Sequence, residues 1–197
     1  DNLKNKIVYI LTTIIAFFAG VIGTIYMIKY IPQEKQIETQ VSNVNITETN
    51  TSNIAIKNIG DLKLTNTTIT SKDAYTIYTD GKFSMDENTT LSSNTQAIHN
   101  NQTEKLVLNG GTLTGIVNDG DLEINEGTVI RNSNNKIGVY MGAAGASTIM
   151  NGGSIETNYV GVVYAGANQT FTMNGGSIKS NNMAITMEGA NGKAVIN

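Results

Sequence analysis

The sequence has no cysteine and no tryptophan, and its 197 residues include one proline, one arginine and one histidine. Without cysteine the chain cannot form disulfides, thiolate metal sites or a thiol nucleophile. A lone histidine, His99, does not supply the ligand set that transition-metal sites use. We therefore predict no metal site and no bound cofactor.

Basic residues are also scarce. Lys and Arg total 13 against 16 Asp and Glu, so the net charge is −3, and the lysines are scattered along the chain. No basic surface of the kind that holds nucleic acid is expected. In contrast, the chain contains 26 Asn and 20 Gly, which supply the left-handed backbone positions of tight corners. This composition indicates a turn-rich β protein.

A stretch without charged side chains runs from Ile7 to Ile28. As a helix it would span about 33 Å, enough to cross a bilayer. We predict a transmembrane anchor helix over residues 7–31, preceded by a short cytoplasmic tail of residues 1–6. A cleaved signal peptide and a buried helix of a soluble domain are the alternatives. The large C-terminal part, rich in Asn and Thr, is expected outside the cell membrane, which makes this a single-pass protein.

The polar segment 32–53 shows no sustained hydrophobic period and is predicted to be a flexible Asn/Thr/Ser-rich linker. Beyond it, residues 54–197 carry a repeat, clearest in Phe171–Ile178 and Thr148–Ile155. Taking the second apolar residue of each copy as a mark gives steps of 21, 23, 16, 26, 23 and 23 residues. The marks are Leu64, Met85, Leu108, Ile124, Met150, Met173 and Ile196. This period predicts an all-β solenoid, a parallel β-helix of about six coils, that is incomplete at its C-terminus.

Three short strands are expected in each coil, giving a triangular cross-section. Their inward columns should include the register marks, a second set of four residues, and a third set with which His99 aligns. The second set is Leu113, Val129, Ile155 and Ile178, and the third is Met141, Tyr164 and Met187.

One corner of the predicted solenoid carries a repeated asparagine. The side-chain amides of this structural ladder should hydrogen-bond along the solenoid axis. The ladder consists of Asn109, Asn125, Asn151, Asn174 and Asn197. A second polar column beside it consists of Thr112, Thr128, Ser154 and Ser177.

The Thr-Met-Asn-Gly-Gly-Ser-Ile repeat resembles the right-handed parallel β-helix repeats of bacterial surface and adhesin-like proteins, over roughly residues 54–197. The resemblance implies the handedness and a surface location, and it implies coil geometry rather than a particular ligand.

Scaffolds of this kind also carry polysaccharide lyases and hydrolases, so acidic side chains must be considered. Four of them cluster around the shortest step: Asp119, Asp121, Glu123 and Glu126. We interpret them as part of a solvated turn. Weak calcium binding is the alternative, although the repeated Gly-x-Gly-x-Asp pattern of calcium-binding solenoids is absent. We predict no catalytic residue and no enzymatic activity.

An outward stripe on the third strand, formed by Tyr140, Val163 and Thr186, carries no charge. Such a stripe can serve as a contact surface for a polysaccharide or protein, or for self-association. The alternative is that these residues reflect only the preference of β-strands for such side chains. The sequence thus predicts a membrane-anchored, surface-exposed protein with a structural or adhesive role. A carbohydrate-active enzyme and a passive stalk are the alternatives.

Overall fold

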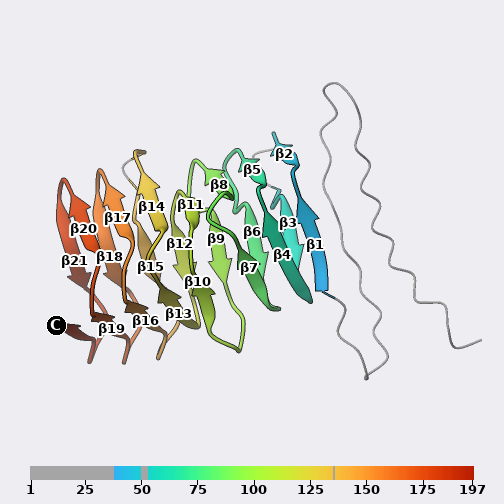
Figure 1. The fold of residues 1–197 in the computed structure, drawn as a ribbon. Helices are drawn as coiled ribbons and strands as arrows, with labels where there is room; N and C mark the ends of the chain where they lie inside the picture. The colour runs from blue at the N-terminus through green and yellow to red at the C-terminus, as the bar shows by residue number, and fades with distance from the viewer. Residues whose placement is uncertain (1–37, 50–52, 135) are drawn as a thin grey trace, which may run out of the picture.

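The computed structural model describes residues 38–49, 53–134 and 136–197. Regular structure in these ranges consists of twenty-two β-strands, with no helix among them. Figure 1 shows the strands stacked turn upon turn along one axis, from β1 at one end to β22 at the other. Every strand pair is parallel. The predicted parallel β-solenoid is therefore confirmed.

Each turn places one strand on each of three faces. The first face consists of two sheets, β1–β4–β7 and β10–β13–β16–β19–β22. Its strands are β1 Glu38–Ser42, β4 Asp61–Thr65, β7 Phe83–Met85, β10 Leu106–Leu108, β13 Asp121–Ile124, β16 Ser147–Met150, β19 Thr170–Met173 and β22 Lys193–Ile196.

The second and third faces are unbroken sheets of seven strands each. The second face consists of β2 Asn45–Glu48, β5 Thr68–Ser71, β8 Thr90–Ser93, β11 Gly111–Leu113, β14 Thr128–Asn132, β17 Ser154–Thr157 and β20 Ser177–Ser180. The third consists of β3 Ile56–Asn58, β6 Ile77–Thr79, β9 Ile98–Asn100, β12 Ile116–Asn118, β15 Val139–Met141, β18 Val160–Tyr164 and β21 Met183–Met187.

The solenoid has about seven turns, one more than predicted, because it begins earlier. Residues 38–48, assigned from sequence to a flexible linker, form β1 and β2 and pair with β4 and β5. Their polar composition conceals the strands, since β1 buries Val41 as its one apolar side chain. A parallel strand can be held by backbone hydrogen bonds to its neighbour even when few side chains enter the core. The predicted anchor, residues 7–31, lies outside the described residues.

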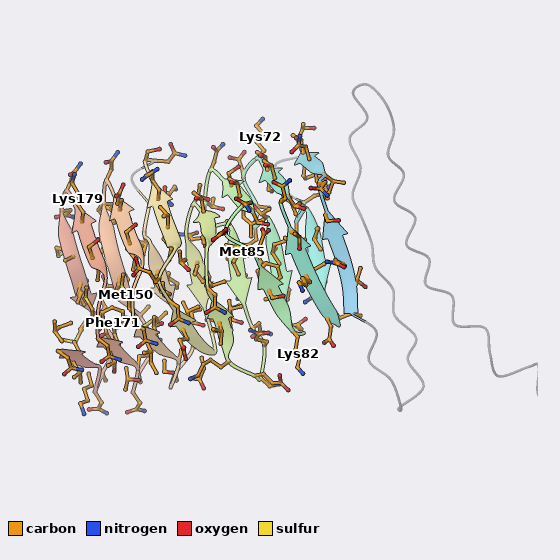
Figure 2. The ribbon with its side chains drawn as sticks, viewed as in Figure 1. Lys72, Lys82, Met85, Met150, Phe171 and Lys179 are labelled. Atoms are coloured by element: carbon orange, nitrogen blue, oxygen red, sulfur yellow. The ribbon has the colours of Figure 1, made fainter. Side chains whose placement is uncertain are left out.

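The core lies between the three faces and is filled by aliphatic side chains, with Met and Phe added on the first face. Leu64, Leu108 and Ile124 are each 0% exposed, as expected for register marks. Figure 2 shows Met150 and Phe171 between the sheets, whereas Lys179 points away from the stack. Burying each large apolar side chain contributes about 1.5–3 kcal/mol, so a turn gains most of its stability from its neighbours.

The fifth turn differs from prediction by one residue. Ile130, rather than Val129, pairs with Leu113 and is fully buried. Val129 instead lies beside Thr112, and Thr128 is buried with its hydroxyl donating to the Leu108 carbonyl at 3.1 Å. The reason is one extra residue in the corner between the ladder asparagine and the second face. A shift of one residue moves a side chain to the opposite face of a strand.

His99 is likewise one position away from the predicted column. Ile98 and Asn100 are the fully buried residues of β9, and His99 points outward between them. It pairs with Val117 and Tyr78 rather than aligning with Met141. The column of inward side chains at the C-terminal ends of the third-face strands therefore contains Asn100 at this turn.

That inward column changes along the solenoid. In the first four turns it is polar and buried, consisting of Asn58, Thr79, Asn100 and Asn118. In the last three turns it becomes Met141, Tyr164 and Met187. We call these two parts the polar column and the apolar column.

The polar column is held by hydrogen bonds between turns. The Asn58 amide donates to the Thr79 hydroxyl at 3.0 Å, and Asn100 donates to the Asn118 oxygen at 2.7 Å. Asn118 donates in turn to the Ser147 carbonyl at 2.8 Å. Its oxygen also accepts the Gly120 N–H at 3.3 Å, as in an Asx-turn.

The connection to the next strand is shortest in parts of the polar column. Two residues connect β3 with β4 and β12 with β13, whereas five residues connect β15 with β16, β18 with β19 and β21 with β22. The connection after β9, with Asn100, also has five residues, and the first-face sheet is interrupted at this point. A buried asparagine therefore allows the tightest corners.

Candidate functional site

The third face presents a single outward column that crosses all seven turns. Alternation along each strand puts one side chain per turn on the outside, and the strand register aligns these side chains. The outward column consists of Lys57, Tyr78, His99, Val117, Tyr140, Val163 and Thr186. The stripe predicted from sequence, Tyr140, Val163 and Thr186, forms its C-terminal part.

Packing within the outward column is close. Val117 and Val163 are only 9% and 3% exposed although they point away from the core. Tyr78 and Tyr140 are half-buried, and Lys57 at the end of the column is exposed. The outward column is thus a flat, mainly apolar surface with two tyrosine rings partly accessible to solvent.

Three aromatic rings meet in the N-terminal part of this surface. The His99 ring lies 4.8 Å from both the Tyr75 and the Tyr78 ring, measured between centroids, and meets each edge to face. The Lys57 ammonium lies 5.5 Å from the centre of the Tyr78 ring, within range of a cation–π interaction. His99 is therefore fixed between two tyrosines on the outside of the solenoid.

A row of polar residues, which we call the polar rank, runs beside the outward column. Each of its members lies two residues after a residue of the column and directly follows the end of a strand: Asp80, Asn101 and Asp119. Their backbone N–H groups continue the sheet by bonding to the preceding turn. The Asn101 amide donates to Asp80 at 2.8 Å. The Asp119 carboxylate lies 2.6 Å from His99 Nε2, and its other oxygen accepts the Ala143 N–H at 2.9 Å. Aromatic and acidic side chains thus lie in adjacent rows.

The electrostatic field of these acids reaches the tyrosines. Burial raises the pKa of Tyr75, and the Asp119 carboxylate raises it further. Burial also raises the pKa of Tyr78, with Asp80 as the next cause. Both phenols keep their protons at neutral pH and can donate a hydrogen bond. The cluster thus provides hydroxyl donors, carboxylate acceptors and ring faces together.

A shallow polar recess of about 180 Å³ adjoins the polar rank at Asp80. It lies where the first turns pass from the third face to the first. Its lining is Ile59, Gly60, Asp61, Asp80, Gly81, Lys82, Gln102, Thr103 and Glu104. Lys82 and Glu104 form an exposed ion pair at 3.6 Å across it.

The four clustered acids do not converge on one space. Each has its own partner: Asp119 with His99, Asp121 with Ser147, Glu123 with Lys105 and Glu126 with the Gly153 N–H. Lys105 and neighbouring amides lower the pKa of Glu123, which is typical of a carboxylate held in its charged form. Within the described ranges, no group of three or more His, Asp or Glu side chains is arranged to hold a metal ion.

The asparagines of the predicted ladder form one column between the first and second faces. Each amide donates to the oxygen of the preceding asparagine, at 2.8, 3.0, 2.9 and 2.7 Å from Asn125 to Asn197. Three further asparagine pairs, which were not predicted, occupy other corner positions: Asn43 with Asn66, Asn158 with Asn181, and Asn168 with Asn191. These amides stabilise corners and contribute no chemistry.

Sequence reasoning missed most of the aromatic cluster. Tyr75, Tyr78, Asp80 and Asn101 lie in the early turns, where the repeat has diverged, and His99 was placed on the wrong face. The usable signal was the register itself. Once Ile77, Ile98 and Ile116 are recognised as one inward column, the residue after each of them must point outward.

No protein-family model, curated protein or solved structure matches this chain. The part of the chain that the structure describes contains no helix long and apolar enough to cross a membrane. What this protein can bind must therefore be inferred from the geometry of the third face.

Proposed function

We propose that this protein is a membrane-anchored, surface-exposed solenoid with an adhesive role, and that its contact surface is the outward column with the adjoining polar rank. The observation that carries the proposal is the row of Tyr78, His99 and Tyr140 beside Asp80 and Asp119. Aromatic faces next to hydrogen-bonding groups suit recognition of a hydroxyl-rich partner such as a polysaccharide.

The flatness of this surface supports binding rather than catalysis. An enzyme that cleaves glycosidic bonds needs two carboxylates facing the same bond across a groove. Asp119 already bonds to His99 and to a backbone N–H, and the neighbouring acids have separate partners. A flat column along the solenoid axis provides a long area of contact without enclosing a substrate.

The membrane location rests on the sequence alone. The uncharged stretch from Ile7 to Ile28 has the length of a bilayer span, and the described domain follows it. An anchor before an elongated domain would hold the third face away from the cell, where a polysaccharide or a protein of another surface can reach it.

The test uses the full chain, immobilised and incubated with a panel of bacterial, host and plant polysaccharides. Retention of a polymer and release of shorter products are both followed. We expect retention without release, reduced about tenfold by Tyr78→Ala, the loss expected when an aromatic contact is removed. The matched control is Tyr159→Ala, which removes a tyrosine that is 44% exposed and lies outside the outward column.

Each other result would favour an alternative. Release of products would replace the adhesive role with an enzymatic one and direct attention to His99 and Asp119. Absence of both retention and release would favour a passive stalk. Equal loss of retention in both tyrosine variants would show that the outward column is not the contact surface.

A further inference from the structure

The proposed adhesive role can be carried one step further, to the class of polymer. We propose that the third face binds a linear, extended glycan without acidic groups, which lies along the solenoid axis with one sugar on each turn. The inference depends on the proposed function, but its test can fail separately.

The spacing of the outward column matches a ligand that is extended along the solenoid axis. Neighbouring turns are separated by about 4.8 Å, so the six steps from Lys57 to Thr186 cover roughly 29 Å. A glycan can follow this axis if each sugar advances by about the distance between two turns, and an extended chain of equatorially linked hexopyranoses meets this condition. A chain that coils, as starch-type glucans do, loses this match after one or two sugars.

The arrangement of aromatic and polar side chains across the surface also suits a sugar chain. Tyr78 and Tyr140 offer ring faces, which pack against the C–H faces of sugar rings. The polar rank lies to one side, where Asp80, Asn101 and Asp119 can accept or donate hydrogen bonds from the ring hydroxyls. A carboxylate accepts up to about four hydrogen bonds, so the bonds already made to Asp119 leave acceptor capacity for a ligand.

The charge of the surface favours a glycan without acidic groups. Of the seven residues in the outward column, only Lys57 is a permanent cation, and it lies at one end over Tyr78. The polar rank contains two carboxylates, Asp80 and Asp119. Burial is the main cause of the raised pKa of Tyr75 and Tyr78, and the negative field of these carboxylates adds to it. A polyuronate would place its own carboxylates against this field, whereas a neutral glycan would not.

The test measures binding of the full chain to three hexasaccharides by titration calorimetry. They are cellohexaose, which is neutral and extended, maltohexaose, which is neutral and coiled, and hexagalacturonate, which is anionic. We expect cellohexaose to bind at least tenfold more tightly than either of the other two. Its affinity should increase from the disaccharide up to about six sugars, since a longer chain covers more of the column between Tyr78 and Thr186.

Two variants locate the binding. Tyr78→Ala should weaken cellohexaose binding about tenfold, and Tyr78→Phe, which keeps the ring, should weaken it less than threefold. Tyr159→Ala is the control and should leave the affinity unchanged. Thermal unfolding of each variant shows whether a loss of binding reflects a loss of the fold.

The two proposals fail in different ways. If the chain retains a polysaccharide but binds maltohexaose or hexagalacturonate as tightly as cellohexaose, the adhesive role stands and the extended, uncharged glycan is wrong. The same conclusion follows if cellohexaose affinity stops increasing beyond two sugars. If no polymer of the retention panel is held, the adhesive role fails and the present inference fails with it.

Discussion

The polar column of the first four turns and the apolar column of the last three occupy the same position in the solenoid, yet they are stabilised differently. Asn58 and Asn118 are buried because their amides bond to the next turn and to their own corner. Met141 and Tyr164 are buried because apolar surface is removed from water. The same backbone position can therefore hold either a hydrogen-bonded polar side chain or an apolar one.

The corner must suit the side chain that precedes it. Where asparagine is buried, its oxygen accepts an N–H of the corner, and two residues are enough to reach the next strand after β3 and β12. After Met141 that bond is missing, and the five-residue connection is stabilised by Gln169. The Gln169 amide donates to the carbonyls of Met141 and Ala143 at 2.8 and 2.6 Å. The comparison teaches that a buried asparagine permits a two-residue corner but does not require one, since the connection after Asn100 has five residues.

The largest effect is expected from breaking the polar column. Asn118→Leu would remove the hydrogen-bond partner of the Ser147 carbonyl and of the Gly120 N–H, and it would leave the Asn100 amide with only its 3.3 Å bond to the Asp121 carbonyl. Each unpaired buried group costs about 1–3 kcal/mol, so the free energy of unfolding should fall by roughly 3–5 kcal/mol. Urea denaturation measures this loss.

The matched variant in the apolar column is Met141→Leu, one turn further along the same column. It should cost less than about 1.5 kcal/mol, since it exchanges one apolar side chain for another of similar volume. Equal losses for Asn118→Leu and Met141→Leu would mean that the two columns do not differ in how they are stabilised.

The second effect is a dependence of the free energy of unfolding on pH, which comes from Tyr164 in the apolar column. Burial raises the pKa of Tyr164 to about 12, whereas the phenol in the unfolded chain ionises near its ordinary value of about 10. The folded pKa is the higher one, so this contribution is fully present below pH 10 and is lost as the pH rises towards 12. The loss should be on the order of 2 kcal/mol.

Tyr164→Phe removes the group that ionises. Comparing its free energy of unfolding with that of the unaltered protein between pH 8 and 12 should show a smaller alkaline loss in the variant. At pH 8 the variant should lose the weak bond from the Tyr164 hydroxyl to the Lys193 carbonyl and the bond between this hydroxyl and the Phe171 backbone. An identical alkaline decline in both proteins would contradict the assignment of this titration to Tyr164.

The smallest effect is expected in the exposed ladder, which runs through both regions. Asn125 follows a two-residue corner and Asn151 a five-residue corner, yet each donates its amide to the preceding asparagine. Asn125→Leu and Asn151→Leu should each lower the free energy of unfolding by about 1 kcal/mol. The melting temperature measures both. An unchanged value for Asn151→Leu would remove the ladder from the stabilising interactions.

Much of the fold could be predicted from sequence because a register repeats. The marks from Leu108 to Ile196 are paired turn by turn in the structure, and the third-strand residues Val139, Val162 and Ile185 are aligned. Parallel stacking forces equivalent residues into columns, so a period read in one turn transfers to the next. Three strands per turn follow from the same spacing.

Two of the failures share one physical cause. A strand has a period of two, so a single unrecognised residue in a corner reverses which side chains are buried. This happened at Val129, after the extra corner residue, and at His99, where the repeat has diverged. The first turn was missed because β1 buries little more than Val41, and a polar strand looks like a linker when its neighbour in space is unknown.

The buried asparagines had a signal that only the structure makes readable. Asn58 and Asn118 are each followed two positions later by glycine, the spacing of the Asx-turn whose N–H they accept. In a chain with 26 asparagines, such a pair is not distinctive by itself. Burial, which distinguishes these two from the exposed ladder, depends on contacts between turns that are distant in sequence.

The hydrogen bonds between turns run along the solenoid axis, and in the sheets each strand bonds to the strands of the neighbouring turns. Tension applied between the two ends would therefore load these bonds one turn at a time, as in a zipper, rather than all together. Met150 and Met173 are 23 residues apart, so each turn that opens would release roughly 75 Å of extended chain. Under tension between its ends, we expect the solenoid to lengthen in steps and to refold when the tension is released.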